Sequence, residues 1–255
     1  MRQCLVIGHF TFIQLIRSKI LINTVLVGLF LGLLSYISYE ISYGARSKMA
    51  LDIGLGFNFL SMVGISLFLG AGLLSEEIES RTLYMGIVSP IKRWQYLLGK
   101  IIGMCLTLIL NSLILMVMIL SSYLIMGGEL NSLIFLSIFF DLLSALIILS
   151  LVIFFSLFTN KIISVLFTVT VAITGSVLHE LALLNFVIKK ESLSQFVDFM
   201  RWWMPNFNIL DIKDLVLYSD TLPTDYLIKT IAYSLTYLFF INLFSCMVFE
   251  KKELN

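Results

Sequence analysis

Long, unbroken apolar runs constrain this chain more than any other feature of its sequence. A helix needs about 20 mainly apolar residues to cross a hydrocarbon core about 30 Å thick. The runs are continuously apolar and do not alternate with a period of two, so they predict helices and not the strands of a barrel. We therefore predict an all-α, polytopic membrane protein. Its six expected transmembrane helices are Ile20–Tyr39, Ile53–Leu74, Ile101–Met126, Ser132–Phe158, Ile162–Ile188 and Tyr226–Phe249.

The fifth run is the least regular, because His179 and Glu180 interrupt it. Two interpretations stay open. The span either continues to Ile188, or it ends near Leu178 and is followed by a half-inserted piece over Leu181–Ile188.

Composition excludes an ordinary soluble domain. The chain has 59% apolar and 13% charged residues, whereas soluble chains have about 45–50% and about 25%. A net charge of +1 provides no basic field for binding nucleic acid, so no such partner is expected. The three cysteines each lie in or beside an apolar run, and we expect no disulfide framework.

The distribution of Lys and Arg predicts the orientation of the chain. With the N-terminus inside, ten of these residues fall on the cytoplasmic side and seven on the outer side. Cytoplasmic loops carry an excess of Lys and Arg. We therefore expect a multi-pass protein of the cytoplasmic (inner) membrane with both termini in the cytoplasm.

The densest charged segment, residues 75–100, lies between the second and third predicted spans. Its first half is acidic: Glu76, Glu77 and Glu79 should extend the second helix into water, and Glu77 with Arg81 forms a supporting i,i+4 pair. An acidic cluster neither anchors to anionic lipid nor enters the bilayer. It therefore indicates a protein partner.

The second half of this segment is basic. Ser89-Pro90 is typical of an N-cap and first helical position, which predicts a helix that begins there and runs on into the third span. Lys92 and Arg93 would lie at the level of anionic headgroups, with Trp94 at the interface. An ordinary juxtamembrane anchor explains these basic residues equally well, although it does not explain the acidic cluster.

Three parts of the chain resemble the permease subunits of type-2 ATP-binding-cassette (ABC) exporters. In that family an acidic cluster ends the second span, a Ser-Pro precedes basic residues, and Leu-Gly-Lys opens the third span. The corresponding residues here are Glu76–Glu79, Ser89-Pro90, Lys92-Arg93 and Leu98-Gly99-Lys100. The aromatic-rich stretch from Phe10 to Leu21 and the ending FEKKELN from Phe249 are also similar to the family. The family's small residue after the acidic cluster is represented by Ser80 or Arg81, which leaves the register of the docking helix open.

The resemblance implies a function. In the family this loop holds a coupling helix that docks into a groove on a separate ATPase subunit, and two permease halves, identical or homologous, form the pathway. The chain would then be a single permease domain, residues 1–255, with an N-terminal interfacial helix (1–19), a cytoplasmic coupling loop (75–100) and an outer loop with short helices (189–225). By resemblance, the candidate ATPase-coupling residues are Glu76, Glu77, Glu79, Arg81, Pro90, Lys92 and Arg93.

The chain itself offers no site for ATP hydrolysis. Gly99-Lys100 is followed by Ile101 and lacks the preceding glycine of a phosphate-binding loop. The longest polar stretch, Lys189–Asp225, is too short for an ATPase domain. ATP and Mg²⁺ are therefore expected on the partner ATPase, with no cofactor on this chain.

Catalytic and metal-binding sets are equally missing from the sequence. His179-Glu180 begins like a zinc-protease helix, but Leu183 occupies the position of the second ligand. We expect no catalytic residue and no metal site. The rival functions are an ATP-independent channel or secondary transporter, which would need more intramembrane charge, and a membrane-embedded enzyme, which this absence disfavours.

Asp141 lies near the middle of the fourth span, where an ionised carboxylate costs several kcal/mol unless it is paired or faces water. One hypothesis places Asp141, with Asn111, on the translocation route. The alternative is a hydrogen bond within the bundle, to Asn111 or Ser112. The sequence favours neither.

The outer loop contains an amphipathic segment. Phe196, Phe199, Met200 and Trp203 recur at helical spacing, and Pro205 ends the pattern. The resemblance implies a lid over the pathway. Anchoring in the membrane interface, with lipid as the partner, is the favoured alternative.

Overall fold

A computed structural model describes residues 2–18, 20–41, 46–79, 92–181, 191–218 and 222–251. Over these residues the chain is helical and contains no strand, which confirms the predicted all-α class. The helices are α1 (Arg2–Arg17), α2 (Ile20–Ile41), α3 (Arg46–Glu79), α5 (Arg93–Ile125), α6 (Ser132–Ser156), α7 (Lys161–Leu181), α9 (Glu191–Trp203), α10 (Lys213–Tyr218) and α11 (Thr224–Lys251).

The long helices confirm a multi-pass membrane protein. Five of the described helices, α3, α5, α6, α7 and α11, are long and apolar enough to cross a membrane. The first predicted span forms helix α2, whose described apolar part, Thr24–Ile37, is shorter than a full crossing. A count of six spans therefore stays a prediction. Helix α7 continues through His179 and Glu180 to Leu181, and residues 182–190 lie outside the described part.

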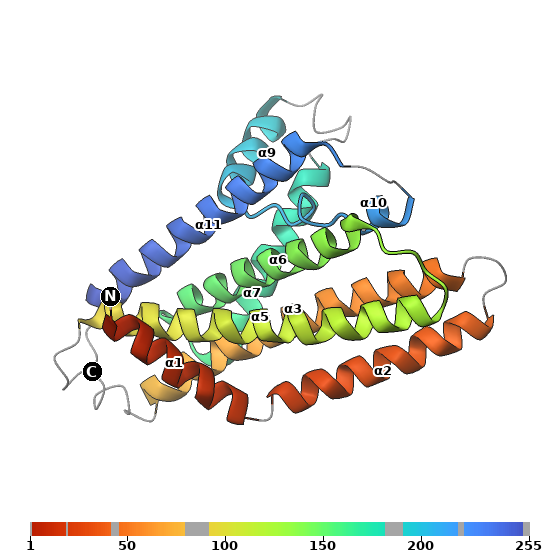
Figure 1. Cartoon of the computed structure of the whole chain (residues 1–255). Helices are drawn as coiled ribbons and strands as arrows, with labels where there is room; N and C mark the ends of the chain where they lie inside the picture. The colour runs from red at the N-terminus through yellow and green to blue at the C-terminus, as the bar shows by residue number, and fades with distance from the viewer. Residues whose placement is uncertain are drawn as a thin grey trace.

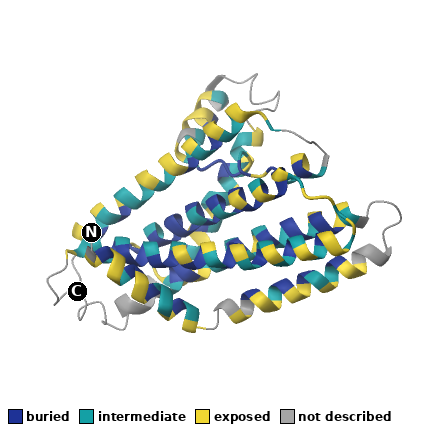
Figure 2. Ribbon diagram, in the orientation of Figure 1, coloured by how far each residue is buried: buried dark blue, intermediate teal, exposed yellow. Residues whose placement is uncertain are grey.

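Helix α6 forms the centre of the bundle. Asn131 caps its N-terminus, where its side-chain oxygen accepts a hydrogen bond from the backbone N–H of Leu133 at 3.3 Å. Helices α3, α5, α7 and α11 all pack against α6, and much of its visible ribbon is dark blue in Figure 2. A helix that is apolar all round is expected in such a position.

The helix ends gather at two ends of the bundle (Figure 1). At one end lie the beginning of α1, the end of α3, the beginning of α5 and the end of α11; we call it the loop end, because α3 and α5 flank the predicted coupling loop. At the opposite end lie α9, α10 and the beginning of α11.

Candidate functional site

Helices α3 and α5 carry the charged loop beyond the thickness of a membrane. They contain 34 and 33 residues, so each is roughly 50 Å long against a hydrocarbon core of about 30 Å. Near the opposite end a Cβ on Gly54 of α3 would lie 3.1 Å from Cγ2 of Ile119 in α5. From that contact α3 continues for 25 residues to Glu79, and α5 extends back 26 residues to Arg93. The two helices therefore stop at about the same level.

The structure covers the predicted coupling residues in part. Helix α3 remains helical through Glu76, Glu77 and Glu79, as the sequence predicted, but nothing is described of their side chains. Arg81 and Pro90 lie outside the described residues. At the start of α5, Lys92 is exposed and Arg93 is half-buried. Their role in docking an ATPase stays a prediction.

The predicted start of a helix at Ser89-Pro90 lies outside the described residues, but its unbroken continuation into the third span is wrong. No helix runs on without a break from Ser89-Pro90, because Lys92 is extended, with φ −68° and ψ 143°, and α5 begins at Arg93. The backbone N–H of Lys92 donates to Oε1 of Gln95 at 3.4 Å. The side chain of Gln95, three residues after the cap, thus accepts a hydrogen bond from a backbone N–H that has no partner within the helix.

Helix α1 is held against the first turns of α5 by glycines. A Cβ on Gly99 would lie 2.7 Å from Cβ of Ile7 and 3.0 Å from the carbonyl oxygen of Cys4. A Cβ on Gly103 would lie 2.7 Å from the carbonyl oxygen of Gly8. Two helix backbones can approach this closely only where side chains are missing. We did not infer this contact from the sequence, although the spacing Gly99-x-x-x-Gly103 is a signal for it.

The polar residues at membrane depth form hydrogen bonds within the chain. Nδ2 of Asn58 in α3 donates to Oδ2 of Asp141 in α6 at 2.7 Å, and Asp141 is only 3% exposed. Asn111 instead donates to Oγ1 of Thr24 in α2. The structure therefore has the hydrogen bond within the bundle, with Asn58 as the partner instead of Asn111 or Ser112. A place for Asp141 and Asn111 on a translocation route stays a prediction.

Two grooves open between neighbouring helices. A cavity of about 340 Å³ lies between α3 and α7, with Phe59, Val63 and Ala172 among its lining residues. A second cavity, of about 540 Å³, lies between α5 and α11 and includes Trp94 and Glu250. The walls of both are mainly apolar, which suits contact with lipid, an apolar substrate or another helix.

At the opposite end residues 204–217, which we call the plug segment, pack into the bundle. Four of its apolar side chains are buried: Phe207, Leu210, Ile212 and Val216. Tyrosines of α11 bind its backbone: Tyr226 donates to the carbonyl oxygen of Ile209 at 2.6 Å, and Tyr233 accepts from the N–H of Asn206 at 2.8 Å. The plug segment was missed by the sequence analysis, which expected only short outer helices there.

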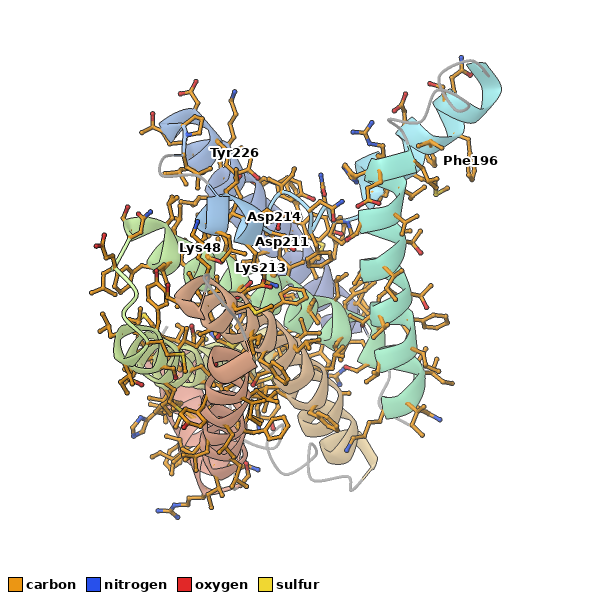
Figure 3. All side chains as sticks on the ribbon, turned by 90° about the vertical axis from the view of Figure 1, so that its right-hand side faces the viewer. Lys48, Phe196, Asp211, Lys213, Asp214 and Tyr226 are labelled. Carbon is orange, nitrogen blue, oxygen red and sulfur yellow. The ribbon has the colours of Figure 1, made fainter. Side chains whose placement is uncertain are left out.

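Helix α9 turns its aromatic residues away from the bundle. Phe196, Phe199 and Trp203 are about 60% exposed, at 58%, 59% and 64%, while Met200 is half-buried. In Figure 3 helix α9 leaves the end of α7 sideways, with Phe196 on its underside. Its charged pair, Arg201 and Asp198, is 3.3 Å apart. This exposure favours anchoring in the membrane interface, and the lid stays a prediction.

The sequence matches the profile of a family described as "ABC-2 family transporter protein" over residues 5–254. The chain belongs to this family. An ABC-2 protein is the membrane component of a transporter, so this chain is an ABC transporter permease and a multi-pass membrane protein. Membership favours the permease over the channel and the membrane-embedded enzyme. A search of curated proteins finds no match to the chain.

Proposed function

We propose that this ABC-2 chain is one permease half of an exporter in the cytoplasmic membrane. It pairs with a second half, identical or homologous, and a separate ATPase that binds ATP and Mg²⁺ docks at the loop end. One observation carries the proposal: α3 and α5 both overrun the hydrocarbon core and stop at about the same level, on either side of the most strongly charged segment. A force applied to the segment between α3 and α5 would be transmitted along these two helices into the membrane.

The position of the loop end also sets the proposed orientation of the chain in the membrane. If the loop end faces the cytoplasm, both termini and the excess of Lys and Arg do so as well, ten residues against seven. The gathering of the beginning of α1 and the end of α11 at the loop end supports this assignment (Figure 1).

The contact between α1 and α5 suggests how a movement of the coupling segment would reach other helices. Because Gly99 and Gly103 bring the two backbones together, α1 would follow α5 as a rigid body. ATP binding would draw two ATPases together, and the coupling segments would shift the permease halves relative to each other. The export direction rests on the family resemblance.

Affinity purification in mild detergent tests this proposal. We expect the tagged chain to retain an ABC ATPase in stoichiometric amount, identified by mass spectrometry. Charge reversal at the loop end, Glu77→Lys with Arg93→Glu, should release it. The matched control is Lys229→Glu, an exposed residue near the start of α11 at the opposite end, which should leave the complex intact.

Two results would contradict the proposal. One is a chain that purifies alone or only with itself from its native membranes. The other is an ATPase lost equally from the Lys229→Glu control. Size-exclusion profiles of every variant distinguish lost docking from misfolding.

A further inference from the structure

Helices α5 and α11 form a groove that runs from the loop end into the membrane. Its volume is about 540 Å³, and along α11 its lining residues extend from Leu235 to Glu250, a distance of about 22 Å at the rise of an α-helix. One leaflet of the hydrocarbon core is about 15 Å thick. In Figure 1 the two helices converge toward the loop end, where Trp94 of α5 and Glu250 of α11 line the groove; we call this part its mouth. The groove is long enough to hold an acyl chain through one leaflet.

The walls of the groove are nearly all apolar. Ile101 of α5 is buried at 6% exposure, whereas Phe239 and Met247 of α11 are 62% and 53% exposed. Asn242 lines the groove between its two ends, and its Nδ2 donates to Oγ of Ser150 in α6 at 3.1 Å. Groups that need hydrogen bonds are costly in hydrocarbon unless the protein supplies partners. Such walls therefore suit a hydrocarbon chain.

Basic residues flank the mouth of the groove on both helices. Lys92 and Arg93 directly precede Trp94 on α5, and Lys251 follows Glu250 on α11. Lys92 and Lys251 are exposed. These two helix ends thus carry three basic side chains near the mouth against the one acidic side chain of Glu250. Basic pockets between membrane helices on the cytoplasmic side bind the headgroups of anionic lipids, and tryptophan is enriched at the level of the headgroups.

The groove is too small for a helix of a second copy. A helical segment 22 Å long and about 10 Å across occupies roughly 1,700 Å³, which is about three times the volume of the groove. A hydrocarbon chain is much thinner than a helix. A chain joined to an anionic headgroup matches both the apolar walls and the basic mouth.

We propose that the groove between α5 and α11 is a binding site for one anionic phospholipid. One acyl chain lies in the groove against Leu238, Leu243 and Cys246, and the headgroup lies at the mouth near Lys92 and Lys251. The bound lipid fills the gap between α5 and the end of α11. If the loop end faces the cytoplasm, the lipid belongs to the inner leaflet. The site itself requires neither an ATPase nor a second permease half.

Native mass spectrometry of the chain purified in mild detergent tests the site. The probes are dioleoyl phosphatidylglycerol and dioleoyl phosphatidylcholine, which have the same chains and differ in the net charge of the headgroup. We expect one phosphatidylglycerol to bind about tenfold more tightly than phosphatidylcholine, because each Lys near the headgroup contributes about fivefold and Glu250 offsets part of this gain. Equal affinities for the two lipids would overturn the proposal.

Removing charge at the mouth tests the position of the headgroup. Lys92→Gln with Lys251→Gln should reduce the preference for phosphatidylglycerol to less than about twofold and leave the affinity for phosphatidylcholine unchanged. The matched control is Lys229→Gln, because Lys229 is exposed near the start of α11 at the opposite end. It should keep the tenfold preference. A preference that survives in the double variant would refute a headgroup site at the mouth.

Filling the groove tests the position of the acyl chain. Leu243→Trp places a bulky ring at a half-buried position that lines the groove, and it should weaken the binding of both lipids about tenfold. Ile228→Trp is the control, because Ile228 is a 67% exposed residue of α11 outside the groove. It should bind both lipids like the parent protein. Parent-like binding by Leu243→Trp would contradict the proposal.

Labelling of Cys246 provides a second measurement that leaves the groove unchanged. With Cys4 and Cys105 replaced by alanine, Cys246 is the only thiol in the chain, and it lines the groove. We expect phosphatidylglycerol to slow its reaction with a small apolar maleimide at least about threefold, and phosphatidylcholine at the same concentration to slow it less. An unchanged rate would overturn the site even if Leu243→Trp does not fold.

Protection of Cys246 in a dimer without added lipid would also overturn the proposal, because side chains of a second copy would then occupy the groove. The assays contain no ATPase. Failure of the lipid site is therefore distinguishable from failure of the proposed function.

Discussion

Helices α6 and α11 are both apolar enough to span a membrane, but they are packed very differently. In the most apolar 18-residue window of α6, 72% of the residues are buried within the chain, against 11% in α11. Helix α6 packs against α3, α5, α7 and α11, whereas α11 packs mainly against α5 and α6. Apolar composition thus indicates that a helix lies in the membrane. It does not indicate whether protein or lipid surrounds it.

The difference has a physical basis. Helices in lipid gain little from the hydrophobic effect and associate through close packing and polar contacts. Helix α6 buries Ser137, Ser144 and Ser150 along its length. Helix α11 leaves Phe239 and Phe244 more than half exposed. Lipid or a second permease half is left to cover that side of α11.

The largest effect is expected where α3 touches α6. A Cβ on Gly70 would lie 2.9 Å from Cβ of Val152, so Gly70→Leu should lower the free energy of unfolding by about 3 kcal/mol. On the same helix nothing lies within 4 Å of a Cβ on Gly64, and Gly64→Leu should change it by less than about 0.5 kcal/mol. Unfolding in mixed detergent micelles measures both. Equal losses would show that α3 is packed as tightly on its open side as against α6.

Large-to-small substitutions sharpen the comparison of α6 with α11. Leu149 in α6 is fully buried and Leu235 in α11 is 55% exposed. We expect Leu149→Ala to cost about 2 kcal/mol, because it leaves a cavity in the bundle, and Leu235→Ala to cost less than about 0.5 kcal/mol. The same unfolding assay applies. A loss at Leu235 that appears only in a dimeric preparation would identify that flank of α11 as an interface between halves.

Removing the donor to Asp141 should have a smaller effect. Asn58→Ala takes away the hydrogen bond of 2.7 Å to the buried carboxylate, and we expect a loss of about 1 kcal/mol. Asn208→Ala is the control, because Asn208 is exposed and its side chain donates at 3.3 Å to Ser176 and Glu180. Its unfolding should be unchanged within about 0.3 kcal/mol. A larger loss at Asn208 than at Asn58 would contradict the view that the buried pair joins α3 to α6.

The smallest effect on stability is expected in α9. Phe196→Ser with Phe199→Ser should change the free energy of unfolding by less than about 0.5 kcal/mol, because both rings are exposed. If α9 is anchored in the interface, the pair should reduce quenching of Trp203 fluorescence by brominated lipid, in a background with Trp94 and Trp202 replaced by Phe. Unchanged quenching would favour the lid.

The sequence predicted the helices better than their contacts. Apolar runs are a local property, and the predicted run Ser132–Phe158 differs from helix α6, Ser132–Ser156, by two residues. Contacts between helices depend on which faces of the helices meet in the folded bundle. Asp141 pairs with Asn58, 83 positions away, and the spacing along either helix could not select Asn58 over Asn111.

The plug segment was unpredictable for the same reason. Ile212 and Val216 lie in a stretch that contains Asp211, Lys213 and Asp214, and such charges are typical of a surface loop. Their side chains become buried where α10 packs against α3 and α6, a contact between distant parts of the chain. The family was predicted by resemblance and is confirmed by the match over residues 5–254, whereas the coupling site at the loop end stays a prediction.

The central claim is that an ATPase docks at the loop end, and photocrosslinking in native membranes tests it most directly. A photoreactive amino acid would replace Lys92, which is exposed just before α5, and in a parallel strain Lys229, which is exposed at the opposite end. We predict a single strong adduct from position 92, identified by mass spectrometry as an ABC ATPase, and no such adduct from position 229. An ATPase adduct from position 229, or none from position 92 in a chain that is inserted and stable, would contradict the account.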